Sequence, residues 1–575
     1  TQIVAAPDLG GLTSSINGLS SQVTMLNNAA SGTVGTLAND IRSINNKFNE
    51  LTGTLFSAIS SLSGGSGDII VDASDVDIDS VTFGKVSSCR NSGAVYGDVN
   101  TGGILAMASL PTYDLNSPGT VYNDFLTSGM TEEQVLENMS DLLNKQWRSK
   151  AINDTYEPGS TFKTLTLAMA LEENVVDLNT GFYCSGSVKI EGETINCSKR
   201  APGHGQQNLT QAFANSCNPA FINIGLRIGN DKFYQYMLDF GLTEKTGIDT
   251  TGEASGFVNS EIKYSTLALA CYAFGQNFNV TPIALLAAQC ACVNGGYLYT
   301  PYLVEEITDQ DGNVVSKHDS TPIRQVVSEE TSALVRDIME YEVTSGTGKN
   351  GQVAGYRIGG KTGTADKGQT GDVVVSFLCF APADDPQIVI LVLLDTPSNS
   401  TGIYISGGQM AAPVVGKMMA DILPYLGVEP SYSETEKTHM DKTVPNVTGL
   451  SVEQAKAVLA EVGLQARIYG DGSTITAQLP GSGAVVANGS TILLYAGKEP
   501  SADKETMPDL SNLSYQTARD RMAALGLYIK TSSSITDTAS QKISGQAVAA
   551  GTELDHGTVV EVTLVTSDSG MLGRY

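Results

Sequence analysis

The sequence predicts a multidomain α/β protein with an N-terminal coiled-coil helix, a central domain whose sheet is sandwiched by helices, and two small α+β repeats at the C-terminus. Three observations support this fold class. Apolar residues keep heptad spacing within residues 12–62, helical runs are interspersed with strands over residues 94–428, and one motif begins at both Pro445 and Pro508. With 575 residues, of which 41% are apolar, the chain is long enough for several cores.

The composition excludes several classes of protein. A net charge of −27 disfavours nucleic-acid binding, because the phosphate backbone would be repelled. The 8 cysteines include no C-x-x-C pair and the 4 histidines are scattered, so we expect no disulfide scaffold, no metal site and no cofactor. The longest fully apolar stretch, Ile388–Leu394, has the length of a strand, and we expect this chain to lack a membrane anchor.

Residues 1–67 are predicted to form a coiled-coil helix and a Gly/Ser hinge. Apolar residues follow steps of three and four from Leu12 to Leu26 and again from Leu37 to Leu62, which favours a homo-oligomer formed through residues 12–62. An amphipathic helix packed on its own chain remains the alternative. Residues 68–93 read as a short β-like or irregular connector, whose aspartates lack the spacing of a calcium loop.

The central domain is expected over residues 94–428. An opening hairpin turns at residues 100–103, and a sheet covered by helices follows. The predicted helices are Thr161–Glu173, Thr210–Asn215, Thr281–Val293, Glu329–Val343 and Ala411–Leu423, and the predicted strands are Tyr356–Gly360, Val373–Ala381 and Ile388–Leu394.

The tail consists of a linker at 429–442 and two repeats at 443–498 and 505–567. Each repeat has a Pro-led strand, a Leu-Ser step, an amphipathic helix and a Gly-Leu pair that opens further strands. Neither repeat contains a set of residues that could carry out catalysis, so we predict that the repeats bind a ligand or act as spacers.

A serine nucleophile needs a base within reach, and Ser160 and Lys163 meet this need if a helix begins after Pro158-Gly159. At positions i and i+3 they lie on one face, and the helix N-terminus together with burial favours a neutral lysine that accepts a proton. A Ser-x-x-Lys pattern alone arises by chance, and a simple helix cap is the alternative for Ser160.

Two further motifs make the pattern specific. Ser216 and Asn218 present a hydroxyl and an amide two residues apart, and Lys361-Thr362-Gly363-Thr364 brings a cation and two hydroxyls on a predicted strand, which suits an anionic substrate end. In this order the three motifs are the known signature of penicillin-binding proteins and class A β-lactamases, and their wide spacing favours the former.

Residues 94–428 thus resemble the transpeptidase domain of a class B penicillin-binding protein, and the two tail repeats resemble PASTA domains. The resemblance extends through "TGGILAMASLPTYDLN", "GHGQQNLTQAFANSCN", "FGLTEKTGID", "TPIALLAAQCACVNGG" and "GGKTGTA". It implies the penicillin-binding-protein/β-lactamase-like fold. Residues before 94 match neither the anchor nor the pedestal domain of that family.

The resemblance also implies roles for the site residues. Ser160 attacks the penultimate D-Ala carbonyl of a peptidoglycan stem peptide, with Lys163 as the base. Ser216 relays a proton to the leaving D-Ala, Asn218 holds the substrate amide and Lys361 supports the relay. Thr362 and Thr364, with Gly363 between them, bind the terminal carboxylate, and the backbone N–H groups of Ser160 and Thr364 form the oxyanion hole.

The implied partners are stem peptides and β-lactam antibiotics at the cell envelope, outside the cytoplasm. A SEDS-type glycosyltransferase and other division or sporulation proteins are further implied partners. Two alternatives stay open: a D,D-carboxypeptidase or β-lactamase-type hydrolase, and a non-catalytic oligomeric surface protein that binds cell-wall fragments.

One cysteine pair is a candidate disulfide. Cys184 and Cys197 flank a segment that is predicted to turn at Glu191-Gly192, so the two thiols face each other across two strands in this hypothesis, or else remain reduced.

Overall fold

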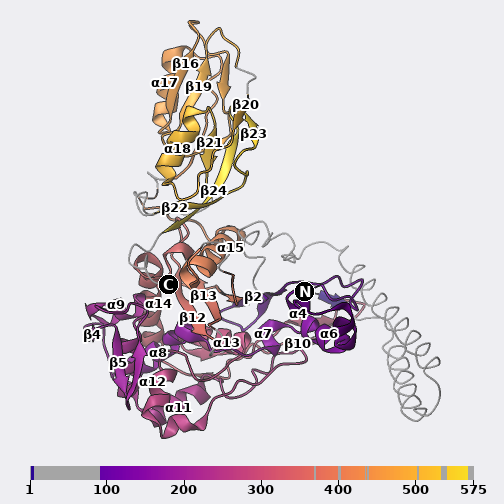
Figure 1. The fold of residues 1–575 in the computed structure, drawn as a ribbon, viewed down its shortest axis with the longest axis vertical. Coiled ribbons are helices and arrows are strands. Elements are labelled where there is room, and N and C mark those ends of the chain that lie inside the picture. The colour runs from indigo at the N-terminus through magenta and orange to yellow at the C-terminus, as the bar shows by residue number, and fades with distance from the viewer. Residues whose placement is uncertain are drawn as a thin grey trace, which may run out of the picture. The chain divides into compact units, whose positions relative to one another are not determined.

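A computed structural model describes residues 2–4, 91–122, 124–367, 371–398, 403–433, 436, 440–500, 504–531 and 541–566 (Figure 1). The predicted coiled coil and most of the predicted connector lie outside these residues. The chain divides into two compact units, of which the larger holds the central sheet and the C-terminal repeats. Among the described residues, no helix combines the length and the apolar character that a membrane span requires.

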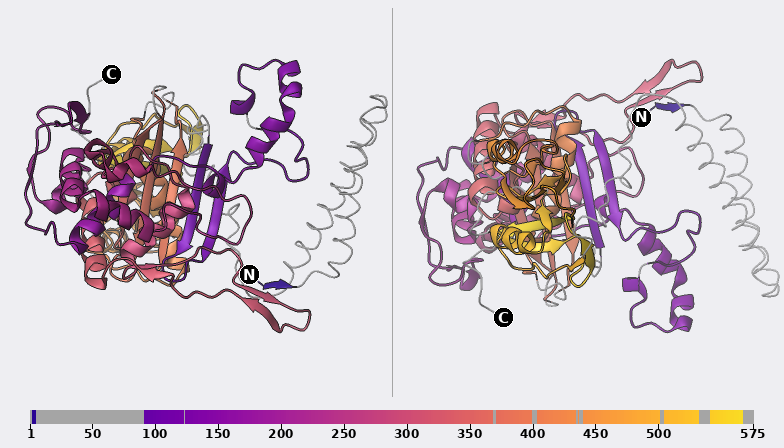
Figure 2. Two further views of the ribbon diagram at one scale, coloured as in Figure 1. Left: turned by 90° about the horizontal axis from the view of Figure 1, so that it is seen from below. Right: turned by 90° about the horizontal axis from the view of Figure 1, so that it is seen from above.

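The central sheet has five antiparallel strands in the order β12-β13-β14-β2-β3. Their bounds are β2 Asn91–Asp98, β3 Ile104–Leu110, β12 Gly359–Asp366, β13 Val373–Ala381 and β14 Ile388–Asp395. The N-terminal hairpin β2–β3 therefore lies beside strands that come almost 300 residues later in the chain (Figure 2). Because Asn91 pairs with Asp395, the sheet begins three residues before position 94, where the sequence placed the start of the domain.

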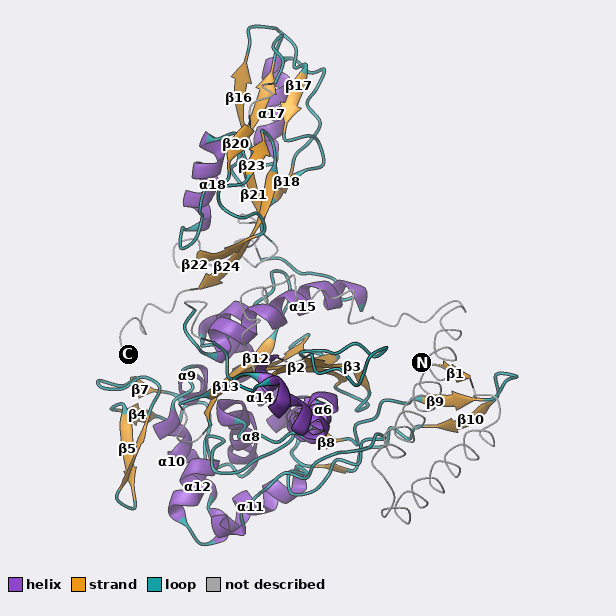
Figure 3. Cartoon of the chain, turned by 45° about the vertical axis from the view of Figure 1, so that its right-hand side comes forward, coloured by secondary structure: helices purple, strands orange, loops and turns teal. Residues whose placement is uncertain are grey.

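Both faces of the sheet are covered. In β13 and β14 alternate residues join two separate cores: Val374, Leu378 and Phe380 belong to one, and Val375, Phe377 and Cys379 to the other. This explains why both strands read as continuous apolar runs. Helices α8 and α14 lie on the first face and α15 on the second (Figure 3), as the fold class predicted.

The helices around the sheet are α7 Lys150–Asn153, η2 Gly159–Phe162, α8 Lys163–Glu172, α9 Leu209–Ala214, α10 Asn218–Ile228, α11 Asn230–Asp239, η3 Ser260–Lys263, α12 Thr266–Tyr272, α13 Pro282–Val293, α14 Glu329–Ser345, η4 Lys349–Gly351, η7 Gly407–Ala411 and α15 Ala412–Tyr425. Small antiparallel strand pairs join β4 Phe182–Cys184 to β7 Gly205–Gln207, β5 Ser187–Ile190 to β6 Glu193–Asn196, and β8 Tyr297–Leu298 to β11 Arg324–Gln325.

One predicted strand starts later than the sequence indicated. The apolar pattern favoured Tyr356–Gly360, but β12 begins at Gly359. The N–H of Tyr356 is bonded to the carbonyl of Val353 in a turn, so it does not join the ladder with β13. The strand instead carries the whole Lys361–Thr364 motif.

The smaller unit contains β1 Gln2–Val4, β9 Glu306–Thr308 and β10 Val314–Lys317 in one sheet, with α4 Asp124–Thr127, α5 Glu132–Glu137 and α6 Met139–Trp147. A capping box on Thr131 starts α5.

The tail forms two copies of one topology, which confirms the internal repeat. The first copy contains β15 Lys442–Thr443, α17 Val452–Glu461, β16 Gln465–Tyr469, β17 Ala477–Leu479, β18 Val485–Val486 and β19 Thr491–Tyr495; the second contains β20 Lys504–Thr506, α18 Tyr515–Ala524, β21 Tyr528–Lys530, β22 Gln541–Gln546, β23 Glu553–Asp555 and β24 Val559–Thr566. Ser451 and Ser514 cap the two helices equivalently. The copies pack on each other, since the Tyr528 hydroxyl lies 2.8 Å from the Thr491 carbonyl oxygen.

Candidate active site

Ser160 lies in η2, a 3₁₀ turn that leads directly into α8, and Lys163 is the first residue of α8. Residues three apart are nearly eclipsed in 3₁₀ geometry, and the Lys163 Nζ lies 3.0 Å from the Ser160 Oγ. The sequence had predicted the first turn of an α-helix, with a capping serine as the alternative. Here Ser160 lies inside η2 and caps no helix.

Gly159 allows η2 to approach strand β12. Its φ of +55° is unfavourable for other residues, and a Cβ at this position would lie 2.8 Å from the carbonyl oxygen of Thr364. The N–H of Gly159 donates to the Gly275 carbonyl at 2.9 Å and holds the turn from the other side. The serine is thereby fixed against the strand that carries the third motif.

Lys163 joins the first two motifs. Its side chain is fully buried, and its Nζ lies 3.0 Å from Ser160 Oγ, 3.1 Å from Ser216 Oγ and 2.7 Å from Asn218 Oδ1. Burial lowers the pKa of Lys163 to about 7, with a further lowering by the nearby Lys361 cation. A large fraction of this amine is therefore neutral at physiological pH, and a neutral amine at hydrogen-bond distance from a hydroxyl can accept its proton.

The second motif occupies the sharp turn between α9 and α10. Ser216 has a φ of +51°, which is uncommon for a residue with a side chain, and its N–H donates to the carbonyl of Phe213. Asn218 begins α10, and its Nδ2 donates to the carbonyl of Asn196 at 3.0 Å. These bonds hold the hydroxyl of Ser216 and the side-chain amide of Asn218 within hydrogen-bond distance of the Lys163 amine.

The third motif lies on β12, which is an edge strand of the sheet. Thr364 is exposed, whereas Lys361, Thr362 and Gly363 are buried. A Cβ on Gly363 would lie 2.3 Å from Ser376 Oγ, so only glycine fits there without a shift. The structure therefore brings all three motifs together, with Thr364 offering the accessible hydroxyl.

Glu342 of α14 is a site residue that sequence reasoning missed. It is fully buried, and its Oε1 lies 3.3 Å from Lys361 Nζ and 3.3 Å from Thr362 Oγ1. Burial lowers the pKa of Lys361, and the Glu342 carboxylate acts in the opposite direction. An acidic residue within the helical run 329–343 was the available signal, but an exposed glutamate has the same appearance in a sequence.

The side chains of Lys361 and Thr362 form hydrogen bonds with Glu342 and Thr347. Among the described residues, the Lys361 ammonium bonds to Glu342 and Thr362 and makes no direct bond to Ser216. The hydroxyl of Thr362 lies 2.6 Å from that of Thr347, so it is already engaged.

The hypothesis of a Cys184–Cys197 disulfide is wrong for this structure, in which both are free thiols. The predicted turn at residues 191–192 does form, between β5 and β6. However, Cys184 lies on β4, which pairs with β7, so the two cysteines are not cross-strand partners in that hairpin.

Residues 92–420 match the family model described as the penicillin binding protein transpeptidase domain, and residues 442–498 and 505–567 match the PASTA domain. Stage V sporulation protein D of Bacillus subtilis is 44% identical over 364 residues, which is 61% of this chain and 55% of that protein. Peptidoglycan D,D-transpeptidase FtsI of Escherichia coli is 30% identical over 361 residues, 61% of this chain and 53% of that protein. The chain thus spans about half the length of the curated relatives it matches.

Solved structures show the same domain. The D,D-transpeptidase domain of a peptidoglycan glycosyltransferase from Eggerthella lenta aligns with a TM-score of 0.51 at 27% identity, covering 61% of this chain and 82% of that one. Penicillin binding protein 3 from Mycobacterium tuberculosis, complexed with aztreonam, aligns with a TM-score of 0.52 at 26% identity and covers 63% of this chain and 78% of that one.

Proposed function

This chain belongs to the penicillin-binding protein transpeptidase family, and we propose on this basis that it is a serine-type peptidoglycan D,D-transpeptidase that acts on D-Ala-D-Ala stem peptides. The observation that carries the proposal is the 3.0 Å contact between Ser160 Oγ and the buried amine of Lys163. The name of one relative, peptidoglycan D,D-transpeptidase FtsI, supports this activity.

In the proposed acylation step, the neutral Lys163 takes the proton of Ser160 as its Oγ attacks the penultimate D-Ala carbonyl. The carbonyl carbon becomes tetrahedral, and its oxygen carries the negative charge. We assign the oxyanion hole to the backbone N–H groups of Ser160 and Thr364, because η2 and β12 approach closely at Gly159.

Collapse of the tetrahedral intermediate expels the terminal D-Ala as its amine, which must gain a proton. In this proposal Lys163 holds the proton taken from Ser160, and we assign to Ser216 the transfer of that proton to the leaving nitrogen; the 3.1 Å distance from Lys163 Nζ to Ser216 Oγ supports this assignment. In this proposal Asn218 holds the substrate amide while its Oδ1 accepts from Lys163. The acyl-enzyme is then taken by an amine of a neighbouring strand.

The terminal carboxylate of the donor peptide is assigned to the β12 end of the site. The exposed hydroxyl of Thr364 is free to face it, and Lys361 supplies positive charge from below the surface. Because the Thr362 hydroxyl is bonded to Thr347, we assign Thr362 chiefly to orienting this part of the site. Gly363 keeps the strand close to the core.

Covalent labelling by a fluorescent penicillin tests the nucleophile, and an assay with a D-Ala-D-Ala peptide, with and without an amine acceptor, tests the transfer. We expect labelling at Ser160 and a product that contains the acceptor. Release of D-Ala with water as the only acceptor would identify a carboxypeptidase instead. A folded protein that neither labels nor turns over peptide would favour the non-catalytic alternative.

The proposal also includes an extracytoplasmic location at the cell envelope, β-lactams as covalent inhibitors, and a SEDS-type glycosyltransferase and division or sporulation proteins as partners. The sporulation name of one relative supports the last of these. Self-association through residues 12–62 stays a prediction from the heptad pattern.

A further inference from the structure

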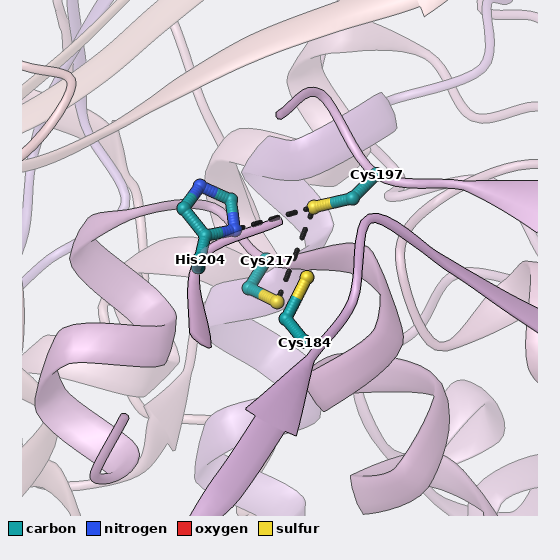
Figure 4. Close-up of side chains that lie close together, drawn as sticks. All are labelled: Cys184, Cys197, His204 and Cys217. Carbon is teal, nitrogen blue, oxygen red and sulfur yellow. Dashed lines mark hydrogen bonds between the residues drawn. The ribbon is translucent and has the colours of Figure 1, made fainter. Parts of the chain in front are cut away.

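Three cysteines and one histidine converge beside the active site (Figure 4). The sulfurs of Cys184, Cys197 and Cys217 and one ring nitrogen of His204 all lie within 4.8 Å of one another. The four residues come from the end of β4, the segment after β6, the turn before β7 and the residue before α10. The three thiols are buried and the imidazole is half-buried.

Two separations within the cluster match those between the ligands of a tetrahedral metal centre. With Zn–S bonds of about 2.3 Å and Zn–N bonds of about 2.0 Å, tetrahedral ligands are separated by about 3.8 Å for two sulfurs and about 3.5 Å for sulfur and nitrogen. The structure has 4.0 Å between the sulfurs of Cys197 and Cys217 and 3.4 Å between Cys197 Sγ and His204 Nδ1. A disulfide would need about 2.05 Å.

Apolar packing alone does not account for the cluster. Buried cysteines are often small hydrophobic residues, but an imidazole nitrogen aimed at the same point brings a polar ligand into the group. Cys₃His is an established ligand set for structural zinc.

We propose that Cys184, Cys197, His204 and Cys217 bind one Zn²⁺ ion as a structural site. From the sequence alone we expect no metal site, because the cysteines include no C-x-x-C pair. The proposed site departs from that expectation. The ligands are widely spaced along the chain, and only the fold of β4 to β7 against α10 gathers them.

The proposed site would stabilise the catalytic loop directly. Cys217 lies between Ser216 and Asn218, both of which bond to Lys163. Asn196, which precedes the ligand Cys197, accepts a hydrogen bond from Asn218. A metal that joins Cys197 to Cys217 thus ties the strand segment to the Ser216-Asn218 turn, whose left-handed residue needs such support.

The first test measures metal content in the full chain, expressed with added zinc and purified under reducing conditions without chelators. Elemental analysis should find about one zinc per chain. Cobalt exchanged for zinc should give the intense visible bands of tetrahedral Co²⁺ and a thiolate charge-transfer band. Wild-type protein with no bound zinc or with an octahedral cobalt spectrum would overturn the proposal, as would a Cys197–Cys217 disulfide in zinc-treated protein.

Matched variants locate the ion. Cys184→Ser removes a ligand distant in sequence from Ser216 and should lose most of the zinc, whereas Cys271→Ser alters a half-buried thiol of α12 outside the cluster and should keep it. Equal zinc in the two variants would contradict the assignment. If Cys184→Ser does not fold, the wild-type cobalt spectrum still decides.

A final readout is independent of activity. Removal of zinc by a chelator should speed amide hydrogen exchange over residues 205–218 more than in the distant helix α17. Unchanged exchange in the zinc-free protein would show that the ion does not stabilise this loop.

Discussion

The pH dependence of acylation gives a direct measurement of the proposed base. Lys163 has an ordinary pKa of 10.5, which burial and the neighbouring Lys361 lower to about 7. At pH 7 the neutral fraction is then about one half, whereas an ordinary lysine would be neutral in about one molecule in 3,000. The environment thus enlarges the population of the active base by about a thousandfold.

The acylation rate should fall as the pH falls, because only the neutral amine of Lys163 can accept the proton of Ser160 and acid protonates that amine. Between pH 6 and pH 8 the neutral fraction rises from about one tenth to about nine tenths, so the acylation rate should rise about tenfold and then level off. Three neighbouring groups also act on the pKa of Lys163: the Lys361 cation lowers it, whereas Cys197 and Cys217 raise it.

The assay is stopped-flow or quenched labelling with a penicillin at concentrations below saturation, with the pH-dependent hydrolysis of the free penicillin subtracted. The Lys163→Arg variant is the matched control, because its guanidinium stays protonated and should be inactive throughout the range. A rate that is constant from pH 5.5 to 8.5, or one that still rises with unit slope above pH 9, would refute the assignment of a lysine base with a pKa near 7.

Ser160→Ala should abolish penicillin labelling without unfolding the protein, whereas Ser216→Ala should retain labelling at a rate about 10²–10⁴-fold lower; the reverse order would exchange their roles. Glu342→Gln should destabilise the protein by about 3–5 kcal/mol in denaturant unfolding, because it leaves a buried ammonium without its counter-ion. The control Glu340→Gln, on the same helix but in a half-exposed ion pair, should cost only about 0–1 kcal/mol, and equal losses would contradict this account. A chain that ends at residue 430 should still react with penicillin, and loss of reaction in a folded truncation would give the PASTA domains a part in the site.

Local patterns in the sequence were sufficient to predict several helices and strands and one contact of the active site. The apolar runs predicted the strands β13 and β14, and the structure shows that their alternate side chains enter two cores, one on each face of the sheet. The repeated Pro-led motif predicted that α17 and α18 are equivalent, since the same capping serine and apolar spacing specify the same helix. The Ser160–Lys163 spacing predicted their contact because three residues make one helical turn.

Only the tertiary structure decided which distant groups meet. Nothing near Glu342 in the sequence indicates that it is buried against Lys361, because its partner lies on a strand that is placed by the whole sheet. For the same reason the hairpin pattern suggested Cys197 as the partner of Cys184, whereas pairing of β4 with β7 and the position of α10 bring both toward His204 and Cys217. Such contacts depend on long-range packing, which balances burial, chain entropy and strand register over many residues and leaves no local signature.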